Sequence, residues 1–305
     1  MNGILNVYKE KDYTSHDVVA KLRGILNTKK IGHTGTLDPM AEGVLPVCIG
    51  GATKLVESFA DETKEYETVM LLGKTYDTLD VTGTLLEDHE VMSTKEEIES
   101  AVMSFAGGYD QVPPMYSAKK VGGQKLYDIA RSGRTVERKS VFVNIFDIDI
   151  LSIELPRVTM RVHCGKGTYI RSLTDDIGRK LGCGAAMEKL TRTRVGNFTI
   201  KEAMRLSEIE EAVSDNKITD VIISAEELFG DLVGVHTSGE TSRLLANGNV
   251  ISGASVRKLA PELETKVQNG TRVRMYDSKG KFTGVYEYRV SDDAFKPYKM
   301  FLNQE

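Results

Sequence analysis

One carboxylate stands in a stretch of loop-forming residues near the N-terminus, residues 32–46, which read GHTGTLDPMAEGVLP. Pro39 disfavours the helical conformation for Asp38, and the nearby glycines permit turns, so we expect this side chain to be displayed and not packed in a core. An aspartate with an ordinary pKa of about 3.9 is ionised at neutral pH and can act as a nucleophile without a separate base. The alternative is that Asp38-Pro39 only begins a turn.

A second site for chemistry lies where a strand pattern meets a helix pattern. Alternating apolar residues at 158–162 run into a glycine-containing turn at 164–169, and Arg171 follows in the first turn of a predicted helix. Glycines let a ligand approach the backbone, and a helix N-terminus favours anions such as phosphate. The turn matches neither a Walker loop nor a dinucleotide fingerprint, so we expect no nucleotide cofactor.

The cysteines give no sign of a metal centre. Cys48, Cys164 and Cys183 are an odd number at wide spacings, which matches neither a disulfide framework nor a zinc ligand set. We expect neither a metal nor any other cofactor.

The charge of the chain is unevenly distributed. The 305 residues carry a formal net charge of −4, which by itself argues weakly against a nucleic-acid partner. Residues 111–140, however, hold seven basic and two acidic side chains, and residues 157–201 hold ten and three. Brought together by the fold, these two blocks would form a cationic surface for a phosphate backbone; kept apart, each would be an ordinary solvated face.

Short, mixed elements position these groups. We expect a helix capped by Ser15 and running to about Leu26 before the Asp38 loop, and a strand over 66–73 after it. A capping box at Thr94 and Glu97 predicts a second helix that ends at Gly107-Gly108. Further along we expect a strand over 141–151 with a bulge where the alternation slips, a strand over 158–162, and a helix over 170–181.

From about residue 230 the pattern changes to short strands, including a hairpin over 272–289. We therefore expect a domain over 1–230 and a small β-rich domain over 231–305. The N-terminus has neither the basic leader nor the apolar run of a secretion signal, and no later segment has the roughly 18 apolar residues of a membrane span. These features predict a cytoplasmic globular protein without a membrane partner.

Taken together, six blocks of sequence resemble the bacterial tRNA pseudouridine synthases that isomerise uridine 55 in the T-loop of tRNA, a branch of the pseudouridine synthase family. The blocks are 15–19, 32–46, 64–66 with 72–73, 77–83, 111–133, and 165–178 followed by 190–192 and 196–198. The resemblance implies an α+β fold, with a mixed, largely antiparallel central sheet and a small β-rich, PUA-like C-terminal domain that binds RNA.

The resemblance also assigns roles to individual residues. Asp38 corresponds to the catalytic aspartate, and whether it attacks C1′, adds to C6 or assists loss of the 2′ proton is left open. Arg171 is expected to pair with Asp38 and favour its ionised form. Tyr66 is expected to stack on the target base where a proton must leave late in the reaction. Because a tyrosine pKa of about 10 makes a poor base, either that pKa is lowered or the proton leaves through water.

The remaining roles concern the RNA. Tyr169 and Leu190 are expected to complete the pocket walls, Lys64 to bind substrate, and His33 to fill the space that an extruded base leaves in the loop. The 111–140 block is expected to be an RNA-contacting insertion, with Lys119, Lys120 and Arg134 among its contacts. The implied partner is the T-arm of tRNA, bound by a monomer.

Two departures from the family pattern and two alternative functions accompany this hypothesis. The family's Lys-Pro-x-Gly turn is replaced by Lys9-Glu10-Lys11-Asp12, which predicts a more mobile or differently shaped loop. The C-terminal segment matches only in position and β character. A non-catalytic tRNA-binding or tRNA-folding protein could use the same surface, and a nucleoside hydrolase or base-excising glycosylase could use the same carboxylate.

Overall fold

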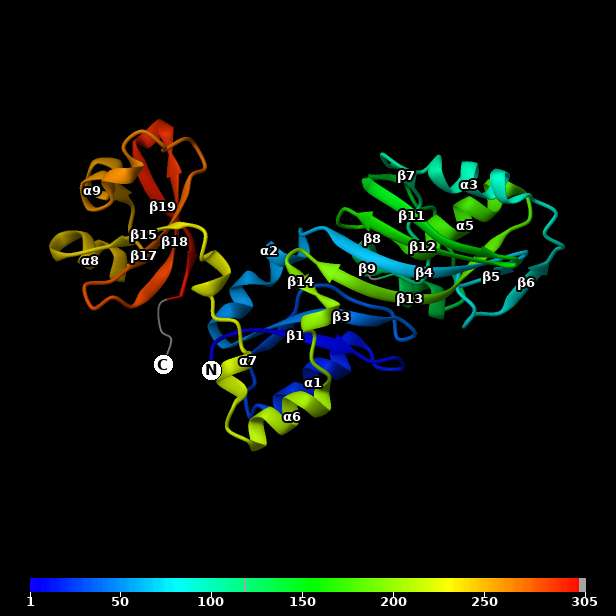
Figure 1. Cartoon of the computed structure of the whole chain (residues 1–305), viewed down its shortest axis with the longest axis horizontal. Coiled ribbons are helices and arrows are strands. Elements are labelled where there is room, and N and C mark those ends of the chain that lie inside the picture. Colours follow the sequence, from blue (N-terminus) through cyan, green and yellow to red (C-terminus); the bar gives the residue numbers. More distant parts are fainter. Residues whose placement is uncertain (118, 302–305) are drawn as a thin grey trace.

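The computed structural model describes residues 1–117 and 119–301, without the side chains of Lys120 and Lys125. Two β-sheets organise these residues, a large one built from the first two thirds of the chain and a smaller one at the C-terminal end, on the left of Figure 1. This confirms the predicted α+β class, with a central sheet and a separate β-rich C-terminal part.

The large sheet has eight strands in the order β1-β3-β13-β4-β12-β11, with β2 paired to β3 and β14 paired to β13. Every pairing is antiparallel except that of β3 with β13, which run parallel at Glu42/Thr191 and Gly43/Arg192. The strands are β1 Gly3–Lys9, β2 Ile31–His33, β3 Glu42–Ile49, β4 Lys64–Leu72, β11 Ile145–Glu154, β12 Arg157–Cys164, β13 Ala185–Val195 and β14 Phe198–Thr199.

Helices cover this sheet in two layers, and each layer packs against apolar side chains of the strands. Along β12, Val158, Met160 and Val162 are fully buried while their neighbours are not, and they pack in one core with apolar residues of α3 (Lys95–Met103) and α5 (Ile170–Leu181). A second core joins β1 and β3 to α1 (Ser15–Ile25) and α6 (Leu206–Ser214). The Asp38 loop, between β2 and β3, contributes Leu37 to the first core.

Three two-stranded sheets and several short helices accompany the large sheet. The pairs are β5 Lys74–Tyr76 with β6 Leu85–Asp88, β7 Tyr109–Gln111 with β10 Val141–Val143, and β8 Lys120–Val121 with β9 Gln124–Lys125. The short helices are α2 Val56–Ala60, α4 Leu126–Arg131 and α7 Ile218–Val221, with 3-10 turns at Gly50–Leu55, Ile200–Glu202 and Glu227–Phe229. The basic 111–140 block therefore lies between β7 and β10 and contains β8, β9 and α4.

The C-terminal sheet has the order β15-β17-β18-β19-β16, with bounds β15 Val233–His236, β16 Ile251–Ser252, β17 Arg272–Tyr276, β18 Phe282–Arg289 and β19 Ala294–Met300. Helices α8 (Gly239–Ala246) and α9 (Gly253–Leu259) and 3-10 turns at Pro261–Leu263 and Val290–Asp292 complete it. A shared core joins it to the large sheet, since Phe282 and Phe301 pack in one cluster with Ile4 and Phe198.

Most predicted elements are present, with two corrections. The cap of α1 is Thr14, which forms a capping box with Asp17, and not Ser15, whose hydroxyl is instead bonded to Leu37. The predicted strand over 141–151 is two strands, because β10 pairs with β7 and β11 pairs with β12; the bulge itself is confirmed at Ile145/Asp147. None of the helices in the described residues is long and apolar enough to span a bilayer.

Candidate active site

Asp38 and Arg171 form the ion pair that the sequence predicts. The Arg171 Nε atom lies 2.9 Å from Asp38 Oδ2, and its Nη2 donates to Oδ1 at 3.1 Å. The arginine side chain is 6% exposed and that of Asp38 is 34% exposed. A two-point contact between a planar guanidinium and a carboxylate fixes orientation as well as charge. The carboxylate is therefore held by its buried partner with part of its surface open.

The Arg171 guanidinium also contacts two further segments of the chain near Asp38. It donates to the carbonyl of Thr78 at 3.1 Å and to that of Tyr116 at 2.7 Å, and its Nη1 atom lies 3.6 Å from the carboxylate of Asp80. Tyr116 lies in the basic insertion, so this one side chain joins the Asp38 loop, the 77–83 turn and the insertion.

Asp80 is a site residue that the sequence reasoning missed. Its carboxylate accepts hydrogen bonds from the hydroxyls of Thr78 and Thr82 and from the Thr82 amide, and only 4% of the residue is exposed. Its only sequence signal was membership of the 77–83 block, which gave it no role, because nothing in the local pattern indicates a contact with Arg171. In the structure, Asp80 is a second carboxylate, besides Asp38, that lies close to the Arg171 guanidinium.

The environment of Asp38 pulls its pKa in two directions. Burial raises the pKa of the carboxyl above its ordinary value, the positive charge of Arg171 opposes this, and the charge of Asp80 adds to the increase. The net direction is upward. Arg171 therefore limits a cost of desolvation that would otherwise favour the protonated, inert form.

The loop on either side of Asp38 is fixed by two side chains from the N-terminal segment. Lys9 is fully buried and its ammonium donates to the carbonyls of Pro39 and Ala41 at 3.2 and 2.5 Å. The Ser15 hydroxyl accepts from the Leu37 amide at 2.9 Å. Because of these bonds, the Lys9 end of the divergent turn is an anchor for the loop, and a more mobile or differently shaped turn over residues 9–12 remains a prediction.

Tyr66 and Leu190 lie on adjacent strands and are 9% and 7% exposed, packed in the same core cluster as Leu37. Burial raises the pKa of the Tyr66 phenol, with a smaller opposing contribution from Arg192. The phenol is therefore protonated at neutral pH, which favours the second of the two predicted routes, proton loss through water.

Tyr169 immediately precedes α5 and is fixed by a side chain that the sequence reasoning did not single out. Its amide donates to Gln111 Oε1 at 2.8 Å, and its carbonyl accepts from Gln111 Nε2 at 3.0 Å. The glutamine is 1% exposed. One side-chain amide thus links the start of the basic insertion to the start of the helix that carries Arg171.

The expected RNA contacts occupy varied environments. Lys64 is 7% exposed and donates to the carbonyls of Ala60 and Glu62 at 2.7 and 2.6 Å, and burial lowers its pKa to about 8. This gives its ammonium a structural role, and a contact with substrate remains a prediction. Burial also lowers the pKa of His33, so its imidazole is neutral at neutral pH.

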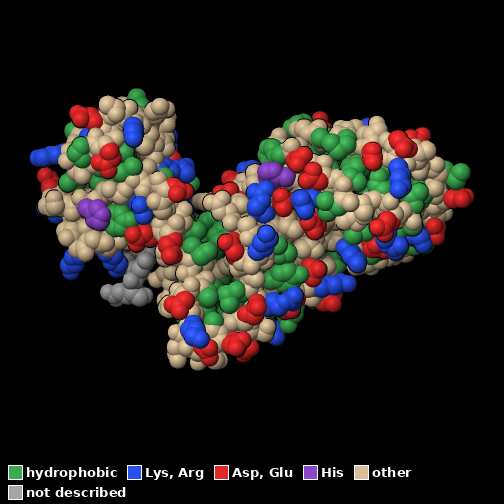
Figure 2. All heavy atoms as spheres, in the orientation of Figure 1, with side chains coloured by type: hydrophobic (Ala, Val, Ile, Leu, Met, Phe, Trp, Pro, Cys, Tyr) green, Lys and Arg blue, Asp and Glu red, His purple; other side chains and the backbone are tan. Residues whose placement is uncertain are grey.

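In the insertion, Arg134 is exposed and Lys119 half-buried, whereas the side chain of Lys120 lies outside the described residues. On the face shown in Figure 2, Lys and Arg side chains are interspersed with Asp and Glu over both bodies of the molecule. The predicted cationic surface therefore stays a prediction.

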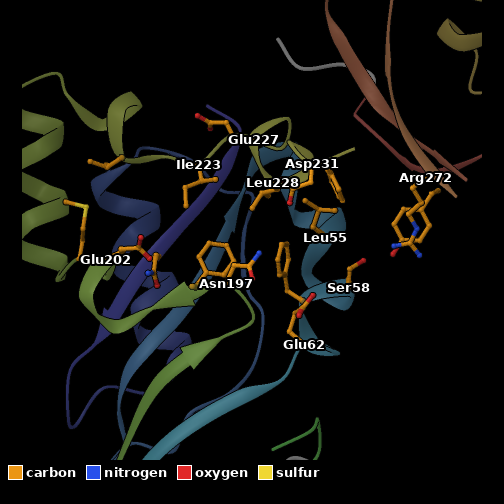
Figure 3. A pocket seen from close by; sticks show the side chains of 17 residues that line it. Leu55, Ser58, Glu62, Asn197, Glu202, Ile223, Glu227, Leu228, Asp231 and Arg272 are labelled. Atoms are coloured by element: carbon orange, nitrogen blue, oxygen red, sulfur yellow. The ribbon is translucent and has the colours of Figure 1, made fainter. Parts of the chain in front are cut away.

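A cavity of about 510 Å³ lies apart from this site, where the large sheet approaches the C-terminal sheet (Figure 3). Neither Asp38, Tyr66 nor Arg171 lines it. Its charged lining residues are Glu62, Glu202, Glu227, Asp231 and Arg272. Because this lining is mainly acidic, it is unsuited to a phosphate backbone. Among residues 1–117 and 119–301, no cluster of His, Cys, Asp or Glu could hold a metal ion.

Comparison with known proteins agrees with this geometry. Residues 23–170 match the model of the N-terminal domain of the TruB family of pseudouridylate synthases, and residues 171–229 match that of the tRNA pseudouridylate synthase B C-terminal domain. The chain is 49% identical to tRNA pseudouridine synthase B of Lachnoclostridium phytofermentans, over 99% of its own length and 100% of the relative's. The chain belongs to the TruB family.

Other relatives support this TruB-family membership over the whole chain. The tRNA pseudouridine synthase B of Clostridium acetobutylicum is 43% identical, with 98% of this chain and 99% of that one covered. Among solved structures, a Cbf5-Nop10-Gar1 complex contains a chain that is 26% identical, with a TM-score of 0.72 over 98% of this chain and 84% of its own. The TruB-family chain is accordingly an enzyme, an isomerase that produces pseudouridylate.

Proposed function

We propose that this TruB-family enzyme converts uridine 55 to pseudouridine in the T-loop of tRNA, with Asp38 as the catalytic carboxylate. The observation that carries the proposal is the two-point ion pair between Asp38 and the buried Arg171, in a chain whose curated relatives are named for tRNA pseudouridine synthesis.

The reaction is an isomerisation in which atoms balance without a co-reactant. The N1–C1′ bond of uridine breaks, the uracil rotates, a C5–C1′ bond forms, the proton on C5 leaves, and N1 gains a proton. An ionised Asp38 assists this exchange at C1′, at C6 or through loss of the 2′ proton. Arg171 orients the carboxylate and opposes its protonation, since a guanidinium at 2.9 Å favours the charged form against the effect of burial.

Access requires extrusion of the target nucleotide, because a base stacked in an RNA loop cannot reach a recessed carboxylate. In the proposed complex Tyr66 stacks on the uracil, Leu190 and Tyr169 form the walls, and His33 takes the place of the extruded base. A neutral imidazole suits stacking within the loop, and the lowered pKa of His33 supports this assignment.

Binding of tRNA is assigned to two regions. The insertion over 111–140 would contact the T-arm through Lys119, Lys120 and Arg134, and residues 231–305 would form an RNA-binding domain beside a catalytic domain over 1–230. We place this activity in a cytoplasmic monomer. The bond from Arg171 to Tyr116 supports coupling between the insertion and the catalytic pair.

The test is an assay of the purified protein on an unmodified tRNA transcript, with chemical labelling that distinguishes pseudouridine from uridine. We expect modification at position 55 and none with Asp38→Asn, whose tRNA affinity should stay within a few-fold of wild type. Unchanged uridine with the wild-type protein would favour a binding or folding protein, release of free uracil would favour a glycosylase, and loss of binding in Asp38→Asn would make Asp38 structural.

A further inference from the structure

Arg192 is a large buried cation beside the catalytic loop that no step above uses. It is 1% exposed. It lies on β13 directly opposite Tyr66 on β4, and on the other side it pairs in parallel with Gly43 of β3. Gly43 has φ +104°, and a side chain there would collide with the Arg192 backbone at 2.3 Å. The arginine thus occupies the junction of the strands that carry the Asp38 loop and Tyr66.

The guanidinium bonds to the Asp38 loop on both sides of the catalytic residue. Its Nε donates to the Val44 carbonyl at 2.7 Å, and its Nη2 donates to the Gly35 carbonyl at 3.3 Å. No carboxylate of the described residues forms an ion pair with it within 4.0 Å. A buried charge without a carboxylate partner is costly, so packing alone is a poor explanation for an arginine here.

The guanidinium is also the charged group that acts most strongly on the phenol of Tyr66, the residue directly opposite Arg192 on the neighbouring strand. Burial raises the pKa of Tyr66 and Arg192 acts in the opposite direction. The other charged or titratable groups that act on this pair come from four strands and the Asp38 loop. Asp38 and Cys164 face the phenol, and Lys9, His33, Lys64 and Cys164 face the arginine.

We propose that Arg192 is a positioning residue for the isomerisation. It fixes the Asp38 loop relative to Tyr66 through the Gly35 and Val44 carbonyls, and it presents a positive charge to the phenol that a proton passes during the reaction. This inference rests on the proposed function. Asp38 is then oriented from two directions, by Arg171 at its carboxylate and by Arg192 through its backbone.

The experiment compares Arg192→Met and Arg192→Lys with Arg194→Met as the matched control. Arg194 lies two residues further along the same strand, is 31% exposed, and pairs with Glu65 at 3.5 Å. Single-turnover isomerisation rates would be measured across pH with saturating enzyme on a tRNA transcript, together with the tRNA dissociation constant and the melting temperature. The pKa of the Tyr66 phenol would be measured in the free proteins by NMR of a ¹³C label at its Cζ.

We expect Arg192→Met to lower the rate at neutral pH by about 100-fold, with tRNA affinity within about threefold of wild type, as for the loss of other preorganised donors. The Tyr66 pKa should rise, because the positive charge that opposes the effect of burial is lost. Arg192→Lys should keep the pH dependence of wild type, at a rate between those of wild type and Arg192→Met. Lysine retains the positive charge but lacks the planar guanidinium that bonds both carbonyls. Arg194→Met should match wild type.

Equal behaviour of Arg192→Met and Arg194→Met would overturn the inference, as would a rate that falls only in proportion to tRNA affinity. Should Arg192→Met not fold, an altered profile or Tyr66 pKa in Arg192→Lys would equally contradict it. A wild-type enzyme inactive on tRNA would refute the proposed function instead, and the free-protein titration would still test the contact between Arg192 and Tyr66.

Discussion

Basic side chains are used differently around the Asp38 loop and in the C-terminal sheet. Near the loop, Lys9, Lys64 and Arg192 are buried and donate to backbone carbonyls. Beside the C-terminal sheet, Arg257 of α9 donates to both carboxylate oxygens of the exposed Asp293, at 2.8 and 2.9 Å. A carbonyl left unpaired in the interior is costly, whereas an exposed ion pair contributes little. The three buried cations therefore fix backbone geometry, whereas the Arg257–Asp293 pair joins two side chains only.

Among the changes that test this comparison, we expect the largest effect at the Asp38–Arg171 pair. Arg171→Lys keeps the charge but cannot make both contacts with Asp38 while reaching Thr78 and Tyr116, because an ammonium lacks the planar fork. We expect the single-turnover rate on a tRNA transcript to fall at least about 100-fold, since misplaced catalytic groups lose that order of rate. Arg179→Lys, on the exposed side of the same helix, is the control. A rate for Arg171→Lys near wild type would contradict the importance assigned to the fork.

Lys9→Met should have the next largest effect, on stability and on its pH dependence. Burial lowers the Lys9 pKa to about 8 from its ordinary 10.5. The folded state therefore loses this proton at lower pH than the unfolded state, so Lys9 makes stability rise with pH between about 8 and 10.5. Below about pH 8 its full cost of burial is present.

We expect urea titrations to show a smaller rise in the free energy of unfolding over this pH interval for Lys9→Met than for wild type. The variant should also modify tRNA more slowly, because the Pro39 and Ala41 carbonyls lose their donor. Lys11→Met, on the exposed part of the same turn, should leave both properties unchanged. An identical pH dependence in wild type and Lys9→Met would refute this account.

A smaller effect is expected from the insertion. The double variant Lys119→Ala/Arg134→Ala should weaken tRNA binding and flatten the dependence of log Kd on log salt, by roughly one unit of slope for each phosphate that the protein no longer neutralises. Filter binding at several salt concentrations measures this. An unchanged slope would mean that the basic insertion does not contact the RNA backbone.

The smallest effect is expected at the Arg257–Asp293 pair beside the C-terminal sheet. Arg257→Met should leave the melting temperature and the isomerisation rate close to wild type, although the pair lowers the pKa of Asp293 to about 2. Thermal unfolding and the tRNA assay check this. A large loss of activity in Arg257→Met would contradict the small contribution assigned to this ion pair. It would instead implicate this surface in tRNA binding.

Local patterns in the sequence were enough to predict most of the elements. The capping box at Thr94 and Glu97 begins α3, and α5 ends at Gly182 with φ +76°, as the glycine indicates. These features depend on hydrogen bonds within three or four residues. The split between β10 and β11 could not be predicted, since the choice of partner strand depends on residues far away in the chain.

The sequence by itself determined three local features: the residue types of the Asp38 loop, the strand pattern that carries Tyr66, and the helix that begins with Arg171 in its first turn. These features were enough to indicate the family and the expected ion pair. Only the tertiary structure decided that Asp80 lies behind Arg171, that Gln111 links the insertion to Tyr169, and that Lys9 and Arg192 fix the loop. The physical reason is that these contacts join segments from 32 to 157 residues apart. Apart from the contact between Asp80 and Arg171, these side chains satisfy backbone groups, which carry no sequence signal of their own.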